Sequence, residues 1–455
     1  MNAATTVGEL PSAGEMLGGR FLIERAVGWG AHGAVYRAVD TSTKQPVAIK
    51  VLRSAGESMV ERFTREARAL RSVAHPAIVR LLASGVTREG DQYLVMEWVE
   101  GESLARALAR GPLALSSALV LGVRLAGALA AVHAAGMVHR DVSPGNVVLP
   151  GGRLAEAKLV DFGIVRLLAE ATTRPGAAAG TPGYMALEQV RGDAAIDARA
   201  DVFGLGCVLY RAIAGAPPFD AEHEVGMSGR VLFDDVPRLS DELPAVPRAL
   251  DDLLARMMAR EPQDRPSGGA AVLRELGLLA AGRAPERPAL RIGARGVPTL
   301  DERRLVSIVV ATPPEGAARA AALERARSSA APFGARVERL ADGTIVAALS
   351  GRGGPRDWAE RAARCALSMR DAMAGAPVAL ATGRAEQSRP GSIGGVIDRA
   401  ATLLGTRHPP APVRAARVED GGVAIDELTA GLLGPPFELV TGAAGRLYLR
   451  GEGTA

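Results

Sequence analysis

The stretch from residue 138 to residue 149 reads Val-His-Arg-Asp-Val-Ser-Pro-Gly-Asn-Val-Val-Leu, and it decides the fold of this chain. A helix-like apolar run precedes it and a β-branched run ends it, so the pattern predicts a polar loop over 139–146, held at both ends. Catalytic side chains are usually placed on such loops. Asp141 is suited to accept a proton from a hydroxyl, while Asn146 offers a neutral oxygen to a hard cation. This pairing is typical of phosphoryl transfer with magnesium.

A glycine-rich stretch lies near the N-terminus. Residues 28–35 read Gly-Trp-Gly-Ala-His-Gly-Ala-Val, between a strand-like run over 21–27 and a second one over 35–39. A helix after these glycines would indicate a dinucleotide site, but a second strand follows, so we predict two antiparallel strands joined by the glycines. Without Cβ atoms, the backbone amides of such a loop approach phosphates closely.

The next β-branched run ends at Lys50, and a helical pattern follows it. Phe63, Glu66, Ala67 and Leu70 fall at i, i+3, i+4 and i+7, so Glu66 lies in the apolar stripe of that helix. An unpaired buried carboxylate is costly, which makes Lys50 its expected partner. A surface lysine on an edge strand is the alternative for Lys50.

After the loop, residues 158–163 read Lys-Leu-Val-Asp-Phe-Gly, a strand that ends at a glycine turn. Asp161 is therefore either an ordinary turn residue or, together with Asn146, a second metal ligand. His133 and Cys207 lie in apolar helical patterns and are expected in the core. Cys207 and Cys365 are far apart without metal-ligand spacing, which fits a reducing compartment.

In this order, these motifs resemble the signatures of eukaryotic-type Ser/Thr protein kinases of bacteria, over residues 20–278. The resemblance implies an α+β, bilobal fold with a β-rich N-lobe and an α-rich C-lobe. It also implies transfer of the ATP γ-phosphate to protein hydroxyls with Mg²⁺. By the same resemblance, Asp141 is the catalytic base, Lys50 and Glu66 form the phosphate-holding pair, and Asn146 and Asp161 hold the metal.

The resemblance further implies a hinge over Glu97–Gly101, whose backbone binds the adenine, and an aspartate, Asp201, that braces the backbone of the catalytic loop. Met96 would guard the back of the pocket, although a Met in an apolar strand is by default a core residue. The implied nucleotide contacts are Gly28, Gly30, Gly33, Val35, Ala48, Lys50, Met96, Glu97 and Val99.

Two positions depart from the family pattern. Ser143 stands in the catalytic loop where the family has a lysine, and Leu187 stands where it has a proline. They leave open a pseudokinase, a nucleotide-binding signalling scaffold, whereas retention of the base and of the metal ligands favours an active enzyme. Thr172, Thr173 and Thr181, in or beside the small-residue segment 164–180, are the candidate phosphorylation sites, including autophosphorylation.

Residues 300–455 alternate strand and helix patterns, with a hairpin signal at Asp342-Gly343. The order resembles the class III nucleotide cyclase domain. The two metal-binding aspartates of that family fall on Thr312 and Gly343, and its asparagine and arginine fall on Asp398 and Thr402. We therefore expect a degenerate, noncatalytic regulatory domain, with a live cyclase as the remote alternative.

The length of 455 residues suggests about three domain-sized units. We expect a disordered N-terminus over 1–19, a kinase domain over 20–278, a linker over 279–299 and the regulatory domain over 300–455. The net charge is +4 with arginines rarely interleaved with aromatics, so no nucleic-acid partner is expected. Arg124 and His133 interrupt the longest apolar run, which predicts a buried helix, no membrane span and a cytoplasmic protein. Protein substrates are the expected partners, and a homodimer through either domain stays open.

Overall fold

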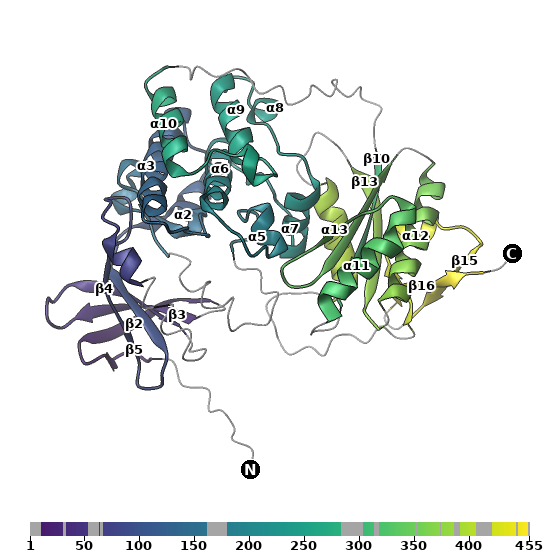
Figure 1. Cartoon of the computed structure of the whole chain (residues 1–455), viewed down its shortest axis with the longest axis horizontal. Helices are drawn as coiled ribbons and strands as arrows, with labels where there is room; N and C mark the ends of the chain where they lie inside the picture. Colours follow the sequence, from purple (N-terminus) through teal and green to yellow (C-terminus); the bar gives the residue numbers. More distant parts are fainter. Residues whose placement is uncertain are drawn as a thin grey trace, which may run out of the picture. The chain divides into compact units, whose positions relative to one another are not determined.

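The computed structural model describes residues 11–30, 33–52, 63, 67–161, 180–283, 304–313, 318–351, 354–373, 375–385, 392–405, 421–442 and 445–453 (Figure 1). The chain divides into two compact units. The first joins Met1–Arg174, Asp197–Gly215 and Arg265–Pro285, and the second joins Pro175–Ile196, Ala216–Asp264 and Glu286–Ala455. Each unit is therefore built from segments that are far apart in the sequence.

The first unit contains a six-stranded sheet in the order β1-β2-β3-β4-β6-β5, in which all neighbours are antiparallel. Buried side chains alternate with partly buried ones along β3, as expected for a strand in a sheet with one buried face. The strands are Met16–Leu17 (β1), Phe21–Gly30 (β2), Gly33–Asp40 (β3), Pro46–Leu52 (β4), Leu81–Val86 (β5) and Gln92–Glu97 (β6).

The predicted glycine hairpin is confirmed, because β2 and β3 pair antiparallel from Phe21 opposite Asp40 to Gly30 opposite Gly33. Gly33 has φ +150°, and a Cβ built there would lie 2.0 Å from the carbonyl oxygen of Val51. A side chain at this position would therefore collide with the backbone of β4. Gly33 is therefore required by the packing of the sheet.

The N-terminus is more ordered than predicted. Residues 1–10 lie outside the described residues, but β1 pairs with β2, and Leu17 is buried in the core of the sheet with Phe21 and Ile23. The prediction of disorder over 1–19 is therefore wrong for residues 16 and 17. Leu17 is buried in the sheet, but the small and polar residues around it gave no sign of a strand there.

The remaining elements of the first unit are helices and a small antiparallel sheet, in the order β7-β8-β9. Gly122 of α3 lies against Leu209 of α6 and Leu276 of α10, so these three helices pack together. The elements are Glu102–Ser103 (β7), Leu104–Leu108 (α2), Leu115–Ala134 (α3), Val147–Leu149 (β8), Lys158–Leu159 (β9), Ala198–Ala214 (α6) and Gly269–Ala280 (α10).

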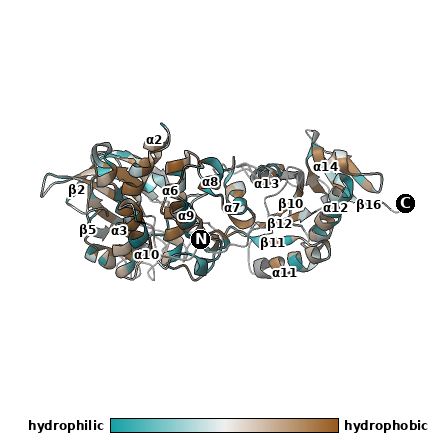
Figure 2. Cartoon of the chain, turned by 90° about the horizontal axis from the view of Figure 1, so that it is seen from above, coloured by the Kyte–Doolittle hydropathy of each residue, from teal (hydrophilic) through white to brown (hydrophobic). Residues whose placement is uncertain are grey.

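Within the described part of the chain, α3 alone is long and apolar enough to cross a membrane. Its residues Leu121, Leu125 and Leu129 are fully buried. Figure 2 shows apolar residues along both α3 and α6. The prediction that this run forms a buried helix is confirmed.

Among its described residues, the second unit contains four helices and a seven-stranded sheet with four further helices. The first group is Leu187–Arg191 (α5), Glu224–Phe233 (α7), Leu239–Glu242 (α8) and Arg248–Met257 (α9). The second group is Arg304–Ala311 (β10), Ala318–Ala330 (α11), Arg336–Arg339 (β11), Ile345–Gly351 (β12), Pro355–Ala372 (α12), Val378–Ala385 (β13), Ser392–Leu403 (α13), Val423–Ile425 (β14), Glu427–Leu432 (α14), Phe437–Thr441 (β15) and Leu447–Glu452 (β16). We call residues 304–453 the C-terminal region.

The sheet of the C-terminal region has the order β11-β12-β10-β13-β14-β16-β15, and only β13 and β14 pair parallel among the described strands. The run β10-α11-β11-β12-α12-β13 has the connectivity of a split βαβ motif. Val309 and Leu380 share one apolar cluster with Ala326 of α11 and Ala366 of α12, so these helices cover one face of the sheet. Helix α13 contacts β10 and β13 and covers the other face (Figure 1).

The predicted hairpin at Asp342-Gly343 is confirmed. Gly343 has φ +91° in the turn between β11 and β12. The Asp342 carboxylate accepts hydrogen bonds from Thr344 N (2.8 Å) and Thr344 Oγ1 (2.9 Å). Asp342 is thus a turn residue, as expected.

Candidate active site

The stretch 138–149 forms a loop between α3 and β8, as predicted. A short 3₁₀ turn, Pro144–Asn146, leads into β8, which pairs with β7 on one side and β9 on the other. Asn146 N donates to Ser143 O (3.1 Å) and closes the turn. The loop is thereby anchored by a long buried helix before it and a three-stranded sheet after it.

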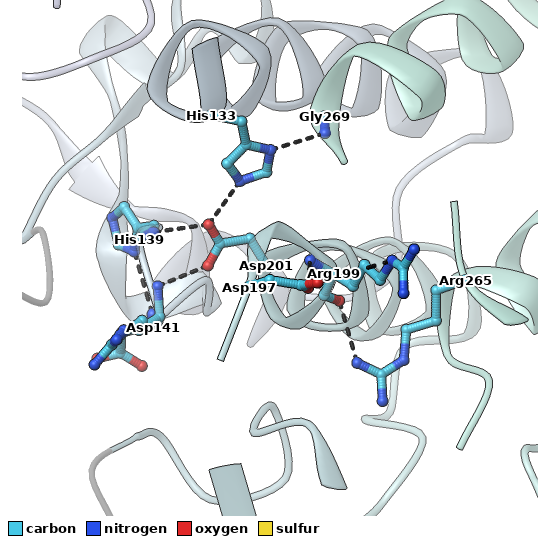
Figure 3. A network of polar contacts seen from close by, with 9 residues as sticks. His133, His139, Asp141, Asp197, Arg199, Asp201, Arg265 and Gly269 are labelled. Carbon is cyan, nitrogen blue, oxygen red and sulfur yellow. Dashed lines mark hydrogen bonds and ion pairs between the residues drawn. The ribbon is translucent and has the colours of Figure 1, made fainter. Parts of the chain in front are cut away.

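Asp201, in the first turns of α6, holds the backbone of this loop (Figure 3). Its Oδ2 accepts the amide hydrogen of His139 (2.7 Å), and its Oδ1 accepts that of Arg140 (2.6 Å). The Asp201 side chain is fully buried. The predicted bracing role of Asp201 is confirmed.

The backbone that Asp201 holds is strained. Arg140 has φ +65°, a left-handed conformation that costs a non-glycine residue of order 1–3 kcal/mol. Hydrogen bonds to a buried, ionised carboxylate are about twice as strong as neutral ones. The bond from Arg140 N to Asp201 therefore offsets the strain and fixes the direction in which the chain reaches Asp141.

His133 anchors the other side of the same carboxylate. Its Nε2 donates to Asp201 Oδ2 (2.9 Å), and its Nδ1 accepts the amide hydrogen of Gly269 (3.0 Å), at the start of α10. A ring nitrogen that accepts a backbone hydrogen carries no proton, so the imidazole is neutral here. His133 is a core residue, as predicted, and it links α3, α6 and α10.

His139 connects the catalytic loop to the strand that precedes Asp161. Its Nε2 donates to Val160 O (3.2 Å), and its Nδ1 accepts from Asp141 N (3.3 Å). The side chain is fully buried, and this burial lowers the pKa of His139 despite the nearby carboxylates of Asp201 and Asp141. The neutral imidazole thus positions the Asp141 backbone, a role that sequence reasoning did not assign to it.

Asn146 and Asp141 are also joined directly. Asn146 Nδ2 donates to Asp141 O (2.9 Å), and Val160 N donates to Asn146 O (2.9 Å). Because the amide nitrogen is the donor to Asp141, the side-chain oxygen of Asn146 is oriented as an acceptor. The structure thus brings the predicted base and one predicted metal ligand together beside the strand leading to Asp161.

Lys50 of β4 forms an ion pair with Asp161 Oδ1. Asp161 has φ +60°, a second strained non-glycine residue at the end of its strand. The predicted partner of Lys50, Glu66, lies outside the described residues, as do Phe162 and Gly163. Lys50 and the second predicted metal ligand, Asp161, are therefore in contact although they lie 111 positions apart in the sequence.

The residues implied as nucleotide contacts lie on β2, β3, β4 and β6 and the segment after β6. Val35 pairs with Lys50, and Ala48 pairs with Met96. Ala48, Met96 and Val99 belong to one apolar cluster, which also contains Val160. An apolar surface therefore adjoins the Lys50–Asp161 pair.

The segment predicted as a hinge follows β6, which ends at Glu97. The Glu97 Oε1 atom accepts from Lys158 Nζ (2.5 Å) and from Arg80 N (3.0 Å). One of the three lysines thus holds the start of this segment, which sequence reasoning missed. The rarity of lysine in this arginine-rich chain could have drawn attention to Lys158.

Ser143 is almost fully buried, with 1% of its surface exposed. Thr181 is partly buried, and Thr172 and Thr173 lie outside the described residues. Among the described side chains, no group of three or more His, Cys, Asp or Glu residues is arranged to hold a metal ion.

Residues 21–275 match the family described as the protein kinase domain. The chain belongs to the protein kinase family. The match covers more than half of the chain and includes the Lys50–Asp161 pair, the braced loop, helices α5 to α9 and the first part of α10. The fold is accordingly the kinase fold with a β-rich N-lobe and a helical C-lobe, within an α+β chain.

Two similar curated proteins are both named serine/threonine-protein kinases. Serine/threonine-protein kinase PknL of Mycobacterium tuberculosis is 36% identical over 276 residues, which cover 59% of this chain and 68% of that protein. Serine/threonine-protein kinase pkn2 of Myxococcus xanthus is 44% identical over 214 residues, or 45% of this chain and 25% of that protein. The chain is an ATP-dependent serine/threonine protein kinase, and the comparisons give no support to the pseudokinase alternative.

Among solved structures, Rad53 residues 1–466 in complex with AMP-PNP aligns with a TM-score of 0.46 and 24% identity, over 56% of this chain and 64% of that one. This similarity is too low to establish anything further about the chain. The family match ends at residue 275, so the C-terminal region lies outside it.

Proposed function

We propose that Asp141 accepts the proton of a protein hydroxyl while the γ-phosphate of ATP is transferred to that oxygen. The observation that carries this proposal is the loop that Asp201 and His139 hold from both sides, which fixes the backbone of Asp141. Phosphoryl transfer depends almost entirely on positioning and electrostatic stabilisation, so a rigid base is what the reaction needs.

Lys50, Asn146 and Asp161 are proposed to hold the phosphates and Mg²⁺. A carboxylate and a neutral amide oxygen are hard ligands that suit Mg²⁺, which usually keeps waters and substrate phosphates as its other ligands. When bound, the ion neutralises charge that develops on the phosphates. Lys50 now pairs with Asp161, so nucleotide binding requires Lys50 to share its charge with the phosphates. The Lys50 to Glu66 pair and the adenine contacts at Glu97 and Val99 are part of this proposal.

Ser143 makes this site unusual. The resemblance places a lysine at this position, and Ser143 supplies no cation. Removing one preorganised donor to developing charge typically costs on the order of 10²- to 10³-fold in rate. We therefore propose a slow kinase, at or below the low end of the roughly 1 to 100 s⁻¹ that is usual for kinases.

Autophosphorylation at Thr172, Thr173 or Thr181 tests the function. Purified full chain is incubated with labelled ATP and magnesium, and the labelled residue is located by mass spectrometry. We expect label on one or more of these threonines in the wild-type protein. A folded wild-type chain that labels neither itself nor any protein substrate would contradict the proposed function.

We propose that the chain comprises a kinase domain over 20–278 and a degenerate class III cyclase-like regulatory domain over 300–455. The β10-α11-β11-β12-α12-β13 order supports the resemblance. Thr312 and Gly343 stand where that family has its metal-binding aspartates, and Gly343 here lies in a tight turn. Two-metal chemistry needs both ligands, so we expect no cyclic AMP or GMP from the full chain with magnesium or manganese.

A cytoplasmic location and protein substrates complete the proposal. Cys207 and Cys365 are both free and buried, and burial raises their pKa values, which keeps the thiols protonated and unreactive. Whether two copies of the chain associate is answered by the mass of the purified protein in solution.

A further inference from the structure

Helices α5 and α7 lie within the residues that match the kinase family, whereas β11, β12 and α13 lie beyond them. All five belong to the second compact unit, and α7 lies beside α13 (Figures 1 and 2). Ala341 N, in the β11–β12 turn, donates to Val190 O (2.8 Å). The last carbonyls of a helix lack partners within it, so this turn caps the end of α5 from outside the kinase region.

An ion pair strengthens the same contact. Arg191, in the last turn of α5, binds Glu338 of β11 at two points, Nε to Oε2 (3.1 Å) and Nη2 to Oε1 (2.8 Å). Arg336 also reaches Glu338 (3.3 Å), and its guanidinium lies 5.2 Å from the ring centre of Phe233, the last residue of α7. Two-point arginine–carboxylate bonds fix orientation as well as distance. The strand β11 therefore holds both α5 and the end of α7.

The start of α7 is capped by α13. Asp398 Oδ2 accepts from Glu222 N (2.9 Å), and Thr402 Oγ1 lies 3.4 Å from His223 Nε2. His223 is the N-cap of α7 and makes no side-chain cap bond of its own. A carboxylate is favourable at a helix N-terminus, and Asp398, 5% exposed, is committed to this position. Asp398 and Thr402 are also the positions where the cyclase family has its asparagine and arginine.

Glycines allow α7 and α13 to approach closely. A Cβ at Gly229 of α7 would lie 2.3 Å from Ile397 Cδ1, and one at Gly394 of α13 would lie 2.7 Å from Arg230 Cδ. Glycine is a poor helix former, and α7 contains two among its ten residues, Gly226 and Gly229. The helical conformation of α7 therefore depends on packing, and α13 supplies part of that packing.

We propose that the C-terminal region acts in cis as a clamp whose docking on α5 and α7 keeps the kinase in its active form. Helix α5 follows Thr181 directly along the chain, so holding its end limits the motion of the segment that carries this threonine. Release would leave Val190 O and Glu222 N without these partners and loosen α7. This inference rests on the proposed kinase function and adds the element that regulates it.

The first test asks whether the contact holds without a covalent link. A protease site is placed between residues 286 and 299 of the full chain, and the cut protein is run on a sizing column. We expect both fragments to elute together. Separation of the wild-type fragments under native conditions at low salt would overturn the proposal.

The second test uses neighbouring glycines on α13 in the uncut chain. Gly394→Trp collides with Arg230, whereas a Cβ at Gly395 meets nothing within 4 Å, so Gly395→Trp is the matched control. We expect Gly394→Trp to lower the rate of protein phosphorylation by roughly 5- to 150-fold, the usual range of coupling between sites. We also expect it to speed amide exchange over 224–233. Gly395→Trp should match the wild type in both.

A charge exchange guards against simple misfolding of the tryptophan variant. Arg191→Glu and Glu338→Arg should each lower the phosphorylation rate, and the double variant should recover most of it. Unchanged rates in Gly394→Trp and in both single variants would overturn the clamp, and faster rates would show that the contact inhibits. A wild-type chain without kinase activity would instead contradict the proposed function, while the sizing and exchange tests would still report on docking.

Discussion

Two buried aspartates, Asp201 and Asp398, each accept backbone N–H groups of another segment of the chain. Asp201 accepts backbone hydrogens from His139 and Arg140 and holds the catalytic loop, while Asp398 accepts one from Glu222 and holds the start of α7. Asp201 also has His133 as a donor. The Asp201 carboxylate holds the loop that carries Asp141, and the Asp398 carboxylate holds the start of α7 against α13. More donors converge on Asp201 than on Asp398, so we expect the contact at Asp201 to resist release more strongly than the contact at Asp398.

The largest effect is expected at the residues that the loop positions. Asp141→Asn removes the proposed base, and Lys50→Met removes the ammonium that faces Asp161. Each should lower phosphorylation on the order of 10³-fold or more, since a positioned base alone contributes about 10²- to 10⁴-fold. The measurement is incorporation of labelled phosphate. Lys44→Met, at an exposed lysine, is the control. Wild-type rates in either variant would sink the assignment.

The comparison itself is tested by the same substitution at both aspartates. Asparagine keeps one acceptor oxygen but turns an N–H₂ group toward the second donor. Asp201→Asn should therefore cost about 3 kcal/mol of unfolding free energy, because a buried donor is left unpaired. Asp398→Asn should cost about 1 kcal/mol, because one oxygen suffices for Glu222 N. Urea unfolding measures both. Equal costs would mean that the number of donors does not decide rigidity. Asp197→Asn, with an exposed side chain, serves as the control for Asp201→Asn.

A substitution at Ser143 tests whether the loop around Asp141 lacks a cation that would speed phosphoryl transfer. Ser143→Lys should raise turnover up to roughly tenfold, less than the 10² to 10³ of a fully preorganised donor, because the site is buried and the new ammonium must reach out of it. The affinity for ATP should change less than turnover. Steady-state kinetics at several ATP concentrations separates the two. A folded variant with unchanged or abolished turnover would show that the loop works without a cation here.

The smallest effect is expected from pH. Burial lowers the pKa of His139 below its ordinary value of 6.5, so the folded chain binds fewer protons than the unfolded one in acid. The stability that His139 contributes is therefore present above about pH 6.5 and is lost as the pH falls toward the lowered pKa. Urea midpoints between pH 7.5 and 5.5 should fall less steeply in His139→Gln than in the wild type. Equal slopes in His139→Gln and in the wild type would exclude His139 as the cause.

Much of the fold could be predicted from local patterns. The loop around Asp141, the Gly28–Gly33 hairpin and the turn at Asp342 each carry their signal within about ten neighbouring residues. Asp201 was predicted through the family resemblance, since its partners lie 61 and 62 residues away. The family match then confirmed the activity that these motifs indicate.

The rest depends on distant pairings that leave no local pattern. The Lys50–Asp161 pair joins residues 111 positions apart, and the contact of Glu222 with Asp398 joins residues 176 positions apart. Nothing in the composition of α7 states that its glycines face another helix. The strand β1 was missed because it consists of two apolar residues, Met16 and Leu17, between polar residues and glycines.

The separation between α7 and its cap also has a consequence during synthesis. Ribosomes add about 5–20 residues per second, so the 176 positions between Glu222 and Asp398 take roughly 10–35 s to make. During that interval the kinase region emerges before its clamp exists. Under the proposed clamp, a newborn chain stays inactive until α13 has been translated, and a chain released before that point stays inactive as well.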